Sequence, residues 1–119
     1  MTLRITSIDA PGNLDAERLI MRAGEELDVG KFAIFCANVT QTGVGSGNIP
    51  AAYWFMDYKV AANDWVVLYT KAGSQSKKNG DSGPTSHFFY WSRQAPLWTP
   101  RTRPVIVYTS PYAFGPLTP

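Results

Sequence analysis

Ser86 and His87 are the adjacent residues whose types most directly suggest hydrolytic chemistry, because a serine nucleophile needs a base beside it. Adjacent residues of a β-strand point to opposite faces, so these two side chains cannot easily share a proton. A catalytic triad also requires an acid that orients the histidine. We interpret His87 as a surface histidine at a strand end, and we expect no catalytic residue and no enzymatic activity.

Metal, phosphate-loop and thiol chemistry are not predicted either. One histidine, one cysteine and scattered carboxylates offer no metal-ligand spacing. The stretch "GVGSGN" (43–48) lacks the Gly-Lys-Ser/Thr of a phosphate-binding loop and leads instead to Pro50 and an aromatic strand, so we interpret it as a mobile inter-strand loop. Cys36 lies in the apolar run "FAIFCAN", which predicts a buried side chain. We therefore expect no metal ion and no cofactor.

Positive charge is concentrated in the second half of the chain. Residues 1–56 carry a net charge of −2 and residues 57–119 carry +4, within an overall net charge of +2. The loop 73–87, "GSQSKKNGDSGPTSH", is longer than an ordinary hairpin connection, and such loops are either functional or simply flexible. If the basic residues near it gather at one end of the molecule, they could hold the phosphates of a nucleic acid or a nucleotide. These candidate anion-binding residues are Lys71, Lys77, Lys78, His87, Arg93, Arg101 and Arg103.

Aromatic residues provide the other candidate site. Both faces of the run "FFYW" (88–91) cannot be buried in a thin sandwich, so either Phe88 and Tyr90 or Phe89 and Trp91 should lie on the outer face. The segment 110–119 carries Tyr112 and Phe114, which are unusual at a free end, and we expect it to dock as an extended strap over an edge or a neighbouring subunit. The candidate partner-binding residues are Tyr90, Trp91, Tyr112 and Phe114.

The elements that position these side chains are predicted to be short strands. Apolar and aromatic runs alternate with breaks rich in Gly, Pro and Asn, and no stretch shows helical periodicity beyond about ten residues. The runs 51–60 and 65–72 are predicted to form a hairpin that reverses at Ala61–Asp64, with Asn63 and Asp64 as turn residues. The pattern predicts an all-β chain, a single immunoglobulin-like β-sandwich of seven to eight short strands over residues 1–109, followed by a proline-rich tail over 110–119.

The order of these pieces resembles the lamin-tail domain over about residues 3–109. The resemblance is carried by a first strand in "LRITSI", by "ELDVGKFAIF", by "YWFMDYKVAANDWVVLYTKAG", by "FFYW" with "LW", and by the closing "VIVYT". Phe32 stands where the family usually has tryptophan, and "TPRTRP" replaces the Gly-Asp that usually precedes the closing strand. The resemblance implies an immunoglobulin-like β-sandwich that acts as a binding or scaffolding module, which in lamins contacts DNA and protein partners.

Two functional hypotheses follow. The first is a non-catalytic interaction or structural module that binds a protein partner or assembles with copies of itself through exposed aromatic residues and the tail. The alternative is an anion-binding module for nucleic acid or nucleotides. The lone cysteine favours a reducing compartment, and the start "MTLRITSID" has no apolar signal-peptide core, so we expect a cytoplasmic protein with no membrane span.

Overall fold

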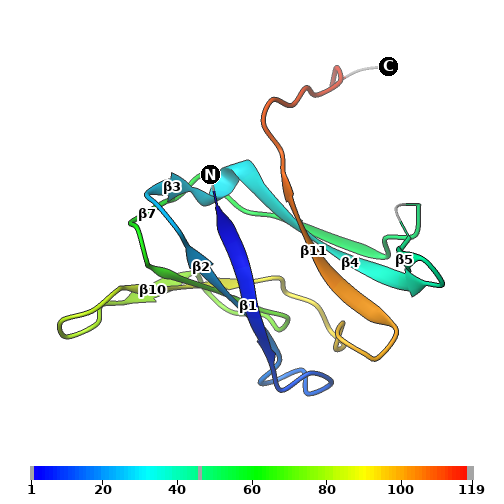
Figure 1. Cartoon of the computed structure of the whole chain (residues 1–119), viewed down its shortest axis with the longest axis horizontal. Helices are drawn as coiled ribbons and strands as arrows, with labels where there is room; N and C mark the ends of the chain where they lie inside the picture. The colour runs from blue at the N-terminus through cyan, green and yellow to red at the C-terminus, as the bar shows by residue number, and fades with distance from the viewer. Residues whose placement is uncertain (1, 46, 118–119) are drawn as a thin grey trace.

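The computed structural model of the chain describes residues 2–45 and 47–117, so Ser46 in the glycine-spaced loop and Thr118 and Pro119 in the tail lie outside it. The regular structure of the described residues consists of eleven short β-strands and one short 3-10 helix (Figure 1). The predicted all-β class is confirmed, and the two main sheets pack face to face as a β-sandwich. In this part of the chain, no helix is long and apolar enough to cross a membrane.

The first sheet has five strands in the order β1-β2-β8-β10-β9. Their bounds are β1 Leu3–Asp9, β2 Arg18–Ala23, β8 Trp65–Tyr69, β9 Ser76–Lys78 and β10 Ser86–Tyr90. Alternate residues of β2 and β10 are buried, as expected for strands with one face on a core. The central strand β8 pairs antiparallel with β2 and parallel with β10, and Val66, Val67 and Leu68 are buried in succession.

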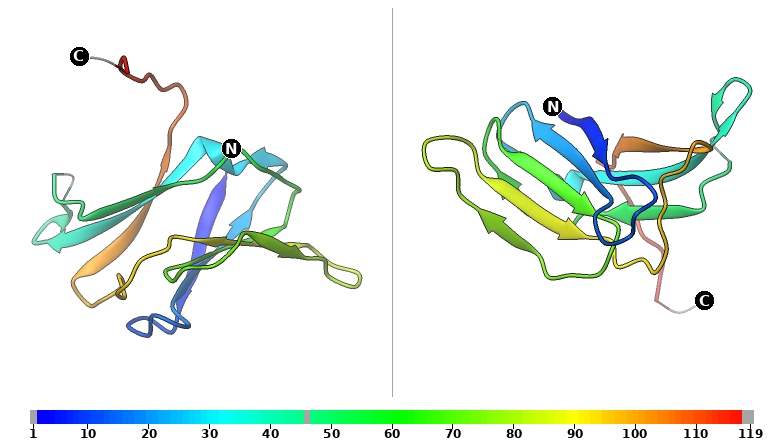
Figure 2. Two further views of the ribbon diagram at one scale, coloured as in Figure 1. Left: turned by 180° about the vertical axis from the view of Figure 1, so that it is seen from behind. Right: turned by 90° about the horizontal axis from the view of Figure 1, so that it is seen from below.

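The second sheet is built around β4 (Phe32–Thr40), the longest strand of the described chain. On one side β4 pairs with β11 (Thr102–Tyr108), and on the other with β6 (Ala51–Trp54). At its far end β4 also pairs with β5 (Gly43–Val44), which forms a small projecting hairpin in Figure 2. A third, two-stranded sheet joins β3 (Leu27–Asp28) to β7 (Lys59–Val60), and the 3-10 helix η1 (Val29–Lys31) follows β3.

The core lies between the two main sheets. Its members come from the inward faces of both, and include Leu19, Met21, Val66, Leu68 and Phe89 from the first sheet and Phe32, Ile34, Cys36 and Ala51 from the second. Cys36 is 1% exposed, which confirms the predicted burial. The same burial raises the pKa of its thiol, because the charged thiolate is poorly solvated there.

The predicted hairpin between 51–60 and 65–72 is wrong, although its turn is present. Asn63 has a φ of 71°, and the backbone N–H of Asp64 donates to the carbonyl oxygen of Ala61 at 3.1 Å. The flanking segments do not pair with each other, however: β6 pairs with β4, β7 with β3, and β8 with β2 and β10. The turn therefore leads from β7 of the small two-stranded sheet into β8 of the five-stranded sheet.

Two strand ends depart from what the local sequence indicates. The polar stretch "GEELDVG" (24–30) is typical of a turn, but it contains β3 and part of η1, and its Val29 is fully buried. The last strand begins at Thr102 rather than Val105 and includes Pro104, which is tolerated because β11 is an edge strand that pairs only with β4.

The tail beyond Thr109 has no strand or helix in the described residues and projects away from both sheets (Figure 1). Its Tyr112 ring packs edge-to-face on Trp54, with the ring centroids 4.9 Å apart. Phe114 is 89% exposed and Leu117 is fully exposed. The expected strap over an edge of the chain's own body is therefore wrong beyond Tyr112, and the neighbouring-subunit alternative stays a prediction.

Candidate functional site

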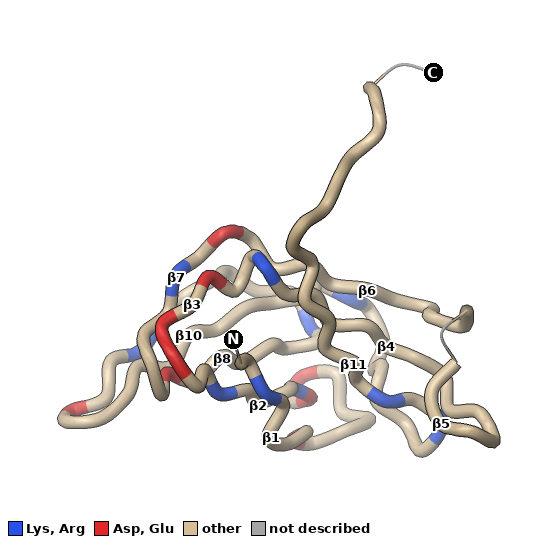
Figure 3. Tube along the Cα trace, turned by 45° about the horizontal axis from the view of Figure 1, so that its top comes forward, with Lys and Arg blue, Asp and Glu red and all other residues tan. Residues whose placement is uncertain are grey.

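The candidate anion-binding residues do not gather at one end of the molecule, as Figure 3 shows for the Lys and Arg positions. Lys77 and Lys78 lie on β9, in register with His87 and Ser86 at the start of β10. Lys71 and Arg93 follow the C-terminal ends of β8 and β10, at the other end of the sheet from Lys77 and Lys78. There the Arg93 N–H donates to the carbonyl oxygen of Thr70. The remaining two, Arg101 and Arg103, belong to the second sheet, since Arg103 is in register with Ala37 of β4 and the Arg101 carbonyl oxygen accepts from the Val39 N–H.

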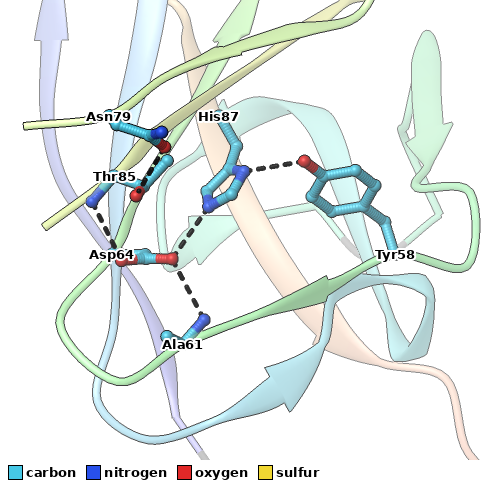
Figure 4. Close-up of polar contacts among 6 residues, drawn as sticks. All are labelled: Tyr58, Ala61, Asp64, Asn79, Thr85 and His87. Carbon is cyan, nitrogen blue, oxygen red and sulfur yellow. Dashed lines mark hydrogen bonds and ion pairs between the residues drawn. The ribbon is translucent and has the colours of Figure 1, made fainter.

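The interpretation of His87 as a surface histidine is wrong. Its side chain points inward, as Phe89 does two residues further along, and it is 5% exposed. Its Nε2 lies 2.8 Å from Oδ2 of Asp64, and its Nδ1 lies 2.9 Å from the hydroxyl of Tyr58 (Figure 4). With the proton on Nε2, the ring donates to Asp64 and accepts from Tyr58, so both ring nitrogens are paired inside the protein.

Asp64 is the acid that sequence analysis took for a simple turn residue. The carboxylate is 6% exposed and accepts from the backbone N–H of Ala61 and of Thr85, both at 3.0 Å, as well as from His87. Burial alone raises the pKa of Asp64, but the hydrogen bonds from His87, Ala61 and Thr85 outweigh it, so the pKa lies below its ordinary value. The carboxylate thus joins the start of β8 to the start of β10.

Glu17 is a second buried carboxylate that sequence analysis did not single out. It is fully buried and accepts hydrogen bonds from the N–H groups of Gly12, Leu97 and Trp98 and from the hydroxyl of Thr70. These donors come from three separate segments, and the contact with Leu97 and Trp98 holds the proline-containing connection 94–100 against the core. The local sequence does not indicate that Glu17 is buried, because its hydrogen-bond donors are either more than fifty residues away or, in the case of Gly12, in a turn.

The outer face of the five-stranded sheet carries stacked aromatic rings and cations, and we call it the aromatic–basic face. Tyr69 and Tyr90 stack with their centroids 5.2 Å apart and their planes 11° apart. The guanidinium of Arg18 lies over Tyr69, and so does the ammonium of Lys71, at 5.8 and 5.1 Å from the ring centroid. The face also includes Arg4, Arg22, Trp65 and Phe88, each of which is next to a buried residue of its strand, and Lys78, which is in register with Ser86.

The expected division of "FFYW" between the two faces is confirmed. Phe89 is fully buried, whereas Phe88 and Tyr90 are partly exposed on the outer face. Trp91, proposed with Tyr90 as a partner-binding residue, contacts Tyr53 and Trp98 and packs against the core. Of these two candidates, Tyr90 lies on the outer face of the sheet, whereas Trp91, which is also partly exposed, packs against the core.

The outer face of the second sheet is apolar, and we call it the apolar face. Ile34 and Cys36 point into the core, so the alternate residues of β4 point outward. In register across the strands, Phe35 lies between Val105 of β11 and Ala52 of β6, and Ala33 lies between Val107 and Trp54. The face therefore consists of Ala33, Phe35, Ala37 and Val39 on β4, Ala52 and Trp54 on β6, and Val105 and Val107 on β11, with Arg103 at the end of the β11 row. Ala33 and Ala37 are buried, Phe35 and the two β11 valines are partly exposed, and Val39, Ala52 and Trp54 are exposed.

A cavity of about 220 Å³ lies at one end of the apolar face, under the β5 hairpin. Its floor includes Phe35, Ala37 and Val105, and Val44 and Ile49 form the wall that the hairpin supplies. Exposed apolar side chains rim it, with Val39 42% and Val44 45% exposed. A site of this kind can hold an aliphatic or aromatic side chain, because apolar lining gains free energy when it leaves water.

Sequence analysis missed the apolar face because nothing in "KFAIFCANV" or "VIVYT" says which alternate residues face the core. A run that is apolar on both faces predicts a strand covered on both sides, and here one of those sides is only partly covered. Among the residues that the structure describes, no group of three or more His, Cys, Asp and Glu side chains is placed to hold a metal ion. No family model, curated protein or solved structure matches the chain.

Proposed function

We propose that this chain is a non-catalytic interaction module that binds an apolar polypeptide segment on its apolar face. The observation that carries the proposal is the row of partly exposed Phe35, Val105 and Val107 beside a cavity of about 220 Å³. Val39 and Trp54 on the same face are exposed. Contiguous exposed apolar surface of this kind marks interaction sites, since monomeric proteins rarely leave it uncovered. The sequence also resembles lamin-tail domains, whose members act as binding or scaffolding modules. That resemblance, itself a prediction, supports a binding function.

The proposal is tested by selecting binders from a displayed library of random peptides against the immobilised chain. We expect enriched peptides that carry aromatic and aliphatic residues and that compete with one another for one site. Val105→Lys should abolish their binding, because it places a charge on the floor of the cavity. Met56→Lys is the matched control, since Met56 is 51% exposed and lies outside the apolar face. Enriched peptides that bind the Val105→Lys variant equally well would overturn the proposal.

A second candidate function is binding of nucleic acid or another polyanion on the aromatic–basic face. The stacked pair of Tyr69 and Tyr90 beneath Arg18 and Lys71 favours it, because exposed rings beside cations are the usual platform for single-stranded nucleic acid. This location differs from the loop end expected from the sequence. It retains Lys71 and Lys78 of the predicted set and leaves Arg101 and Arg103 on the other sheet.

Fluorescence anisotropy with a labelled single-stranded oligonucleotide at low salt tests this second candidate. Lys71→Glu with Lys78→Glu should weaken binding strongly and flatten its salt dependence. Arg101→Glu with Arg103→Glu makes the same change in net charge on the second sheet and should leave the affinity nearly unchanged. Equal losses in the two double variants would show that only net charge matters, and no binding by the unmodified chain would eliminate the candidate.

A further inference from the structure

We infer that the apolar face binds the C-terminal segment of a second copy of this chain, in a reciprocal exchange that forms a dimer. The inference rests on the proposed function, and it adds the identity of the bound segment. The segment, residues 110–117, is called the tail segment below. Its sequence is "SPYAFGPL".

The tail segment is uncharged and exposes large apolar side chains, as a peptide does before it binds to an apolar site. It contains no charged residue, and its large apolar side chains are among the most exposed of the described chain: Tyr112 is 63%, Phe114 89% and Leu117 103% exposed. Apolar side chains exposed to this extent cost free energy in water unless something covers them. The only ring contact that the structure records for the tail segment among described residues is that of Tyr112 with Trp54.

The apolar face matches the tail segment in charge and in shape. Arg103, in register with Ala37, is the one charged residue in the rows that β4 forms with β11 and β6. A charged peptide would leave most of its charges unpaired over Phe35 and Val105, because Arg103 alone could pair with an acidic group, whereas an uncharged apolar segment leaves none. The cavity of about 220 Å³ under the β5 hairpin offers a place for one large side chain, for which Phe114 is our candidate.

The direction of the tail segment favours a second copy over the chain's own face. The segment leaves β11 after Tyr108, passes Trp54 at the rim of the apolar face, and then projects away from the body (Figure 2). Nine residues separate Tyr108 from Leu117, so the segment spans at most about 30 Å. The described chain, with its projecting tail included, measures 43 × 37 × 28 Å, so that reach extends across the face of a neighbouring molecule. Pro111 and Pro116 reduce the conformational freedom that the segment would lose on binding.

The area that the segment can bury argues for exchange in both directions. An aromatic side chain buries about 150–250 Å², so Tyr112, Phe114 and Leu117 together bury on the order of 500 Å² of the segment and a similar area of the face. One such contact totals about 1,000 Å², below the roughly 1,200–2,000 Å² of stable interfaces, whereas two reciprocal contacts reach about 2,000 Å². A reciprocal pair also closes, while a one-way contact repeats into open chains.

Sedimentation velocity over a concentration series tests the dimer with full-length protein. We expect the unmodified chain to form a monomer–dimer equilibrium. Phe114→Ser with Leu117→Ser should raise the dissociation constant at least about 100-fold, because two apolar side chains lose their burial. Val105→Lys should have the same effect through the other half of the contact, and Met56→Lys should have none. An unmodified chain that stays monomeric, or a dimer that survives both changes, overturns the inference.

A labelled peptide of residues 110–119 identifies the occupant directly. Its acceptor is the full-length chain with Phe114→Ser and Leu117→Ser, whose apolar face is unchanged. Saturable binding that is lost with Val105→Lys in the acceptor, or with the Phe114→Ser peptide, supports the inference. If this peptide fails to bind while library peptides bind at Val105, the inference falls and the proposed function stands; if neither binds, both fall. A third outcome is a monomeric unmodified chain that does not bind the peptide, while the variant with the altered tail does. That outcome would mean that the apolar face is covered by the tail of the same chain, and it would also overturn the inference.

Discussion

The buried carboxylate of Asp64 connects three parts of the chain through hydrogen bonds. Its two carboxylate oxygens accept from the backbone of Ala61 and Thr85 and from the ring of His87, and His87 in turn contacts Tyr58. The sequence showed a turn at Asn63-Asp64 and a histidine in a strand. It could not show that they meet, because their contact depends on β8 and β10 lying parallel with Ser86 beside Trp65. Pairing of distant strands is not encoded in any local pattern.

Asp64→Asn should destabilise the fold by about 1–3 kcal/mol at neutral pH, because an amide cannot accept from all three donors and leaves at least one unpaired. The pKa of Asp64 is lowered by folding. The stabilisation is therefore present above the unfolded pKa of about 3.9 and is lost as the pH falls through the lower folded value. Urea unfolding should show a gap between variant and unmodified protein that shrinks below pH 4. Asp81→Asn, in an exposed loop, is the control and should show no gap; a gap for Asp64→Asn that does not change with pH would contradict the argument.

The thiol of Cys36 should react slowly with a thiol reagent in the folded protein. The side chain is 1% exposed and its pKa is raised by burial, so both access and the thiolate fraction are low. Labelling followed by mass spectrometry should be slow in native buffer and fast in denaturant. Equal rates in the two conditions would show that the β4 strand opens readily.

At the scale of elements, the sequence predicted most strands and few of their partners. The runs "LRITSI", 65–72 and "FFYW" overlap β1, β8 and β10, and Gly12 in the Pro-Gly turn after β1 has a φ of 89°. The hairpin expected on either side of Ala61–Asp64 failed, since a short turn between two apolar runs is equally compatible with a crossing between sheets. The same limit explains why the basic residues were expected together and the apolar face was not expected at all.

Position within the sheet should set the rate of amide hydrogen exchange. β8 lies between β2 and β10 and is buried over three successive residues, whereas β9 is a three-residue edge strand that is exposed throughout. We expect the amides of Val66 and Leu68 to exchange slowest, near the limit of global unfolding, and those of β9 to exchange fast. Hydrogen exchange followed by NMR measures both. Protection in β9 that equals that of β8 would mean that a partner covers this edge.

At the scale of the whole molecule, the tail segment adds little to the stability of a single chain. Tyr112 makes the one ring contact with the body that the described tail shows, through Trp54. Removing residues 110–119 should therefore lower the melting temperature of the monomer, measured at high dilution by fluorescence, by no more than about 4 °C, the shift expected for a loss of roughly 1 kcal/mol. Phe89→Ala, which empties the core, is the comparison and should cost about 3–5 kcal/mol. A tail deletion as costly as Phe89→Ala would show that the segment folds back on its own body.

The antiparallel pairing of β2 with β8 has a consequence for how the chain folds. Leu19 of β2 lies opposite Leu68 of β8, so the contact closes a loop of about fifty residues. That loop contains β3, β4, β5, β6 and β7, and therefore most of the second sheet. If β2 paired with β8 while β3 to β7 were still unfolded, the inner face of the first sheet would have no second sheet to cover it. The core residues of both sheets would then remain exposed to water, so this state is unfavourable. Both sheets are thus expected to form in one slow, cooperative step, with tryptophan fluorescence and far-ultraviolet circular dichroism recovering at the same rate.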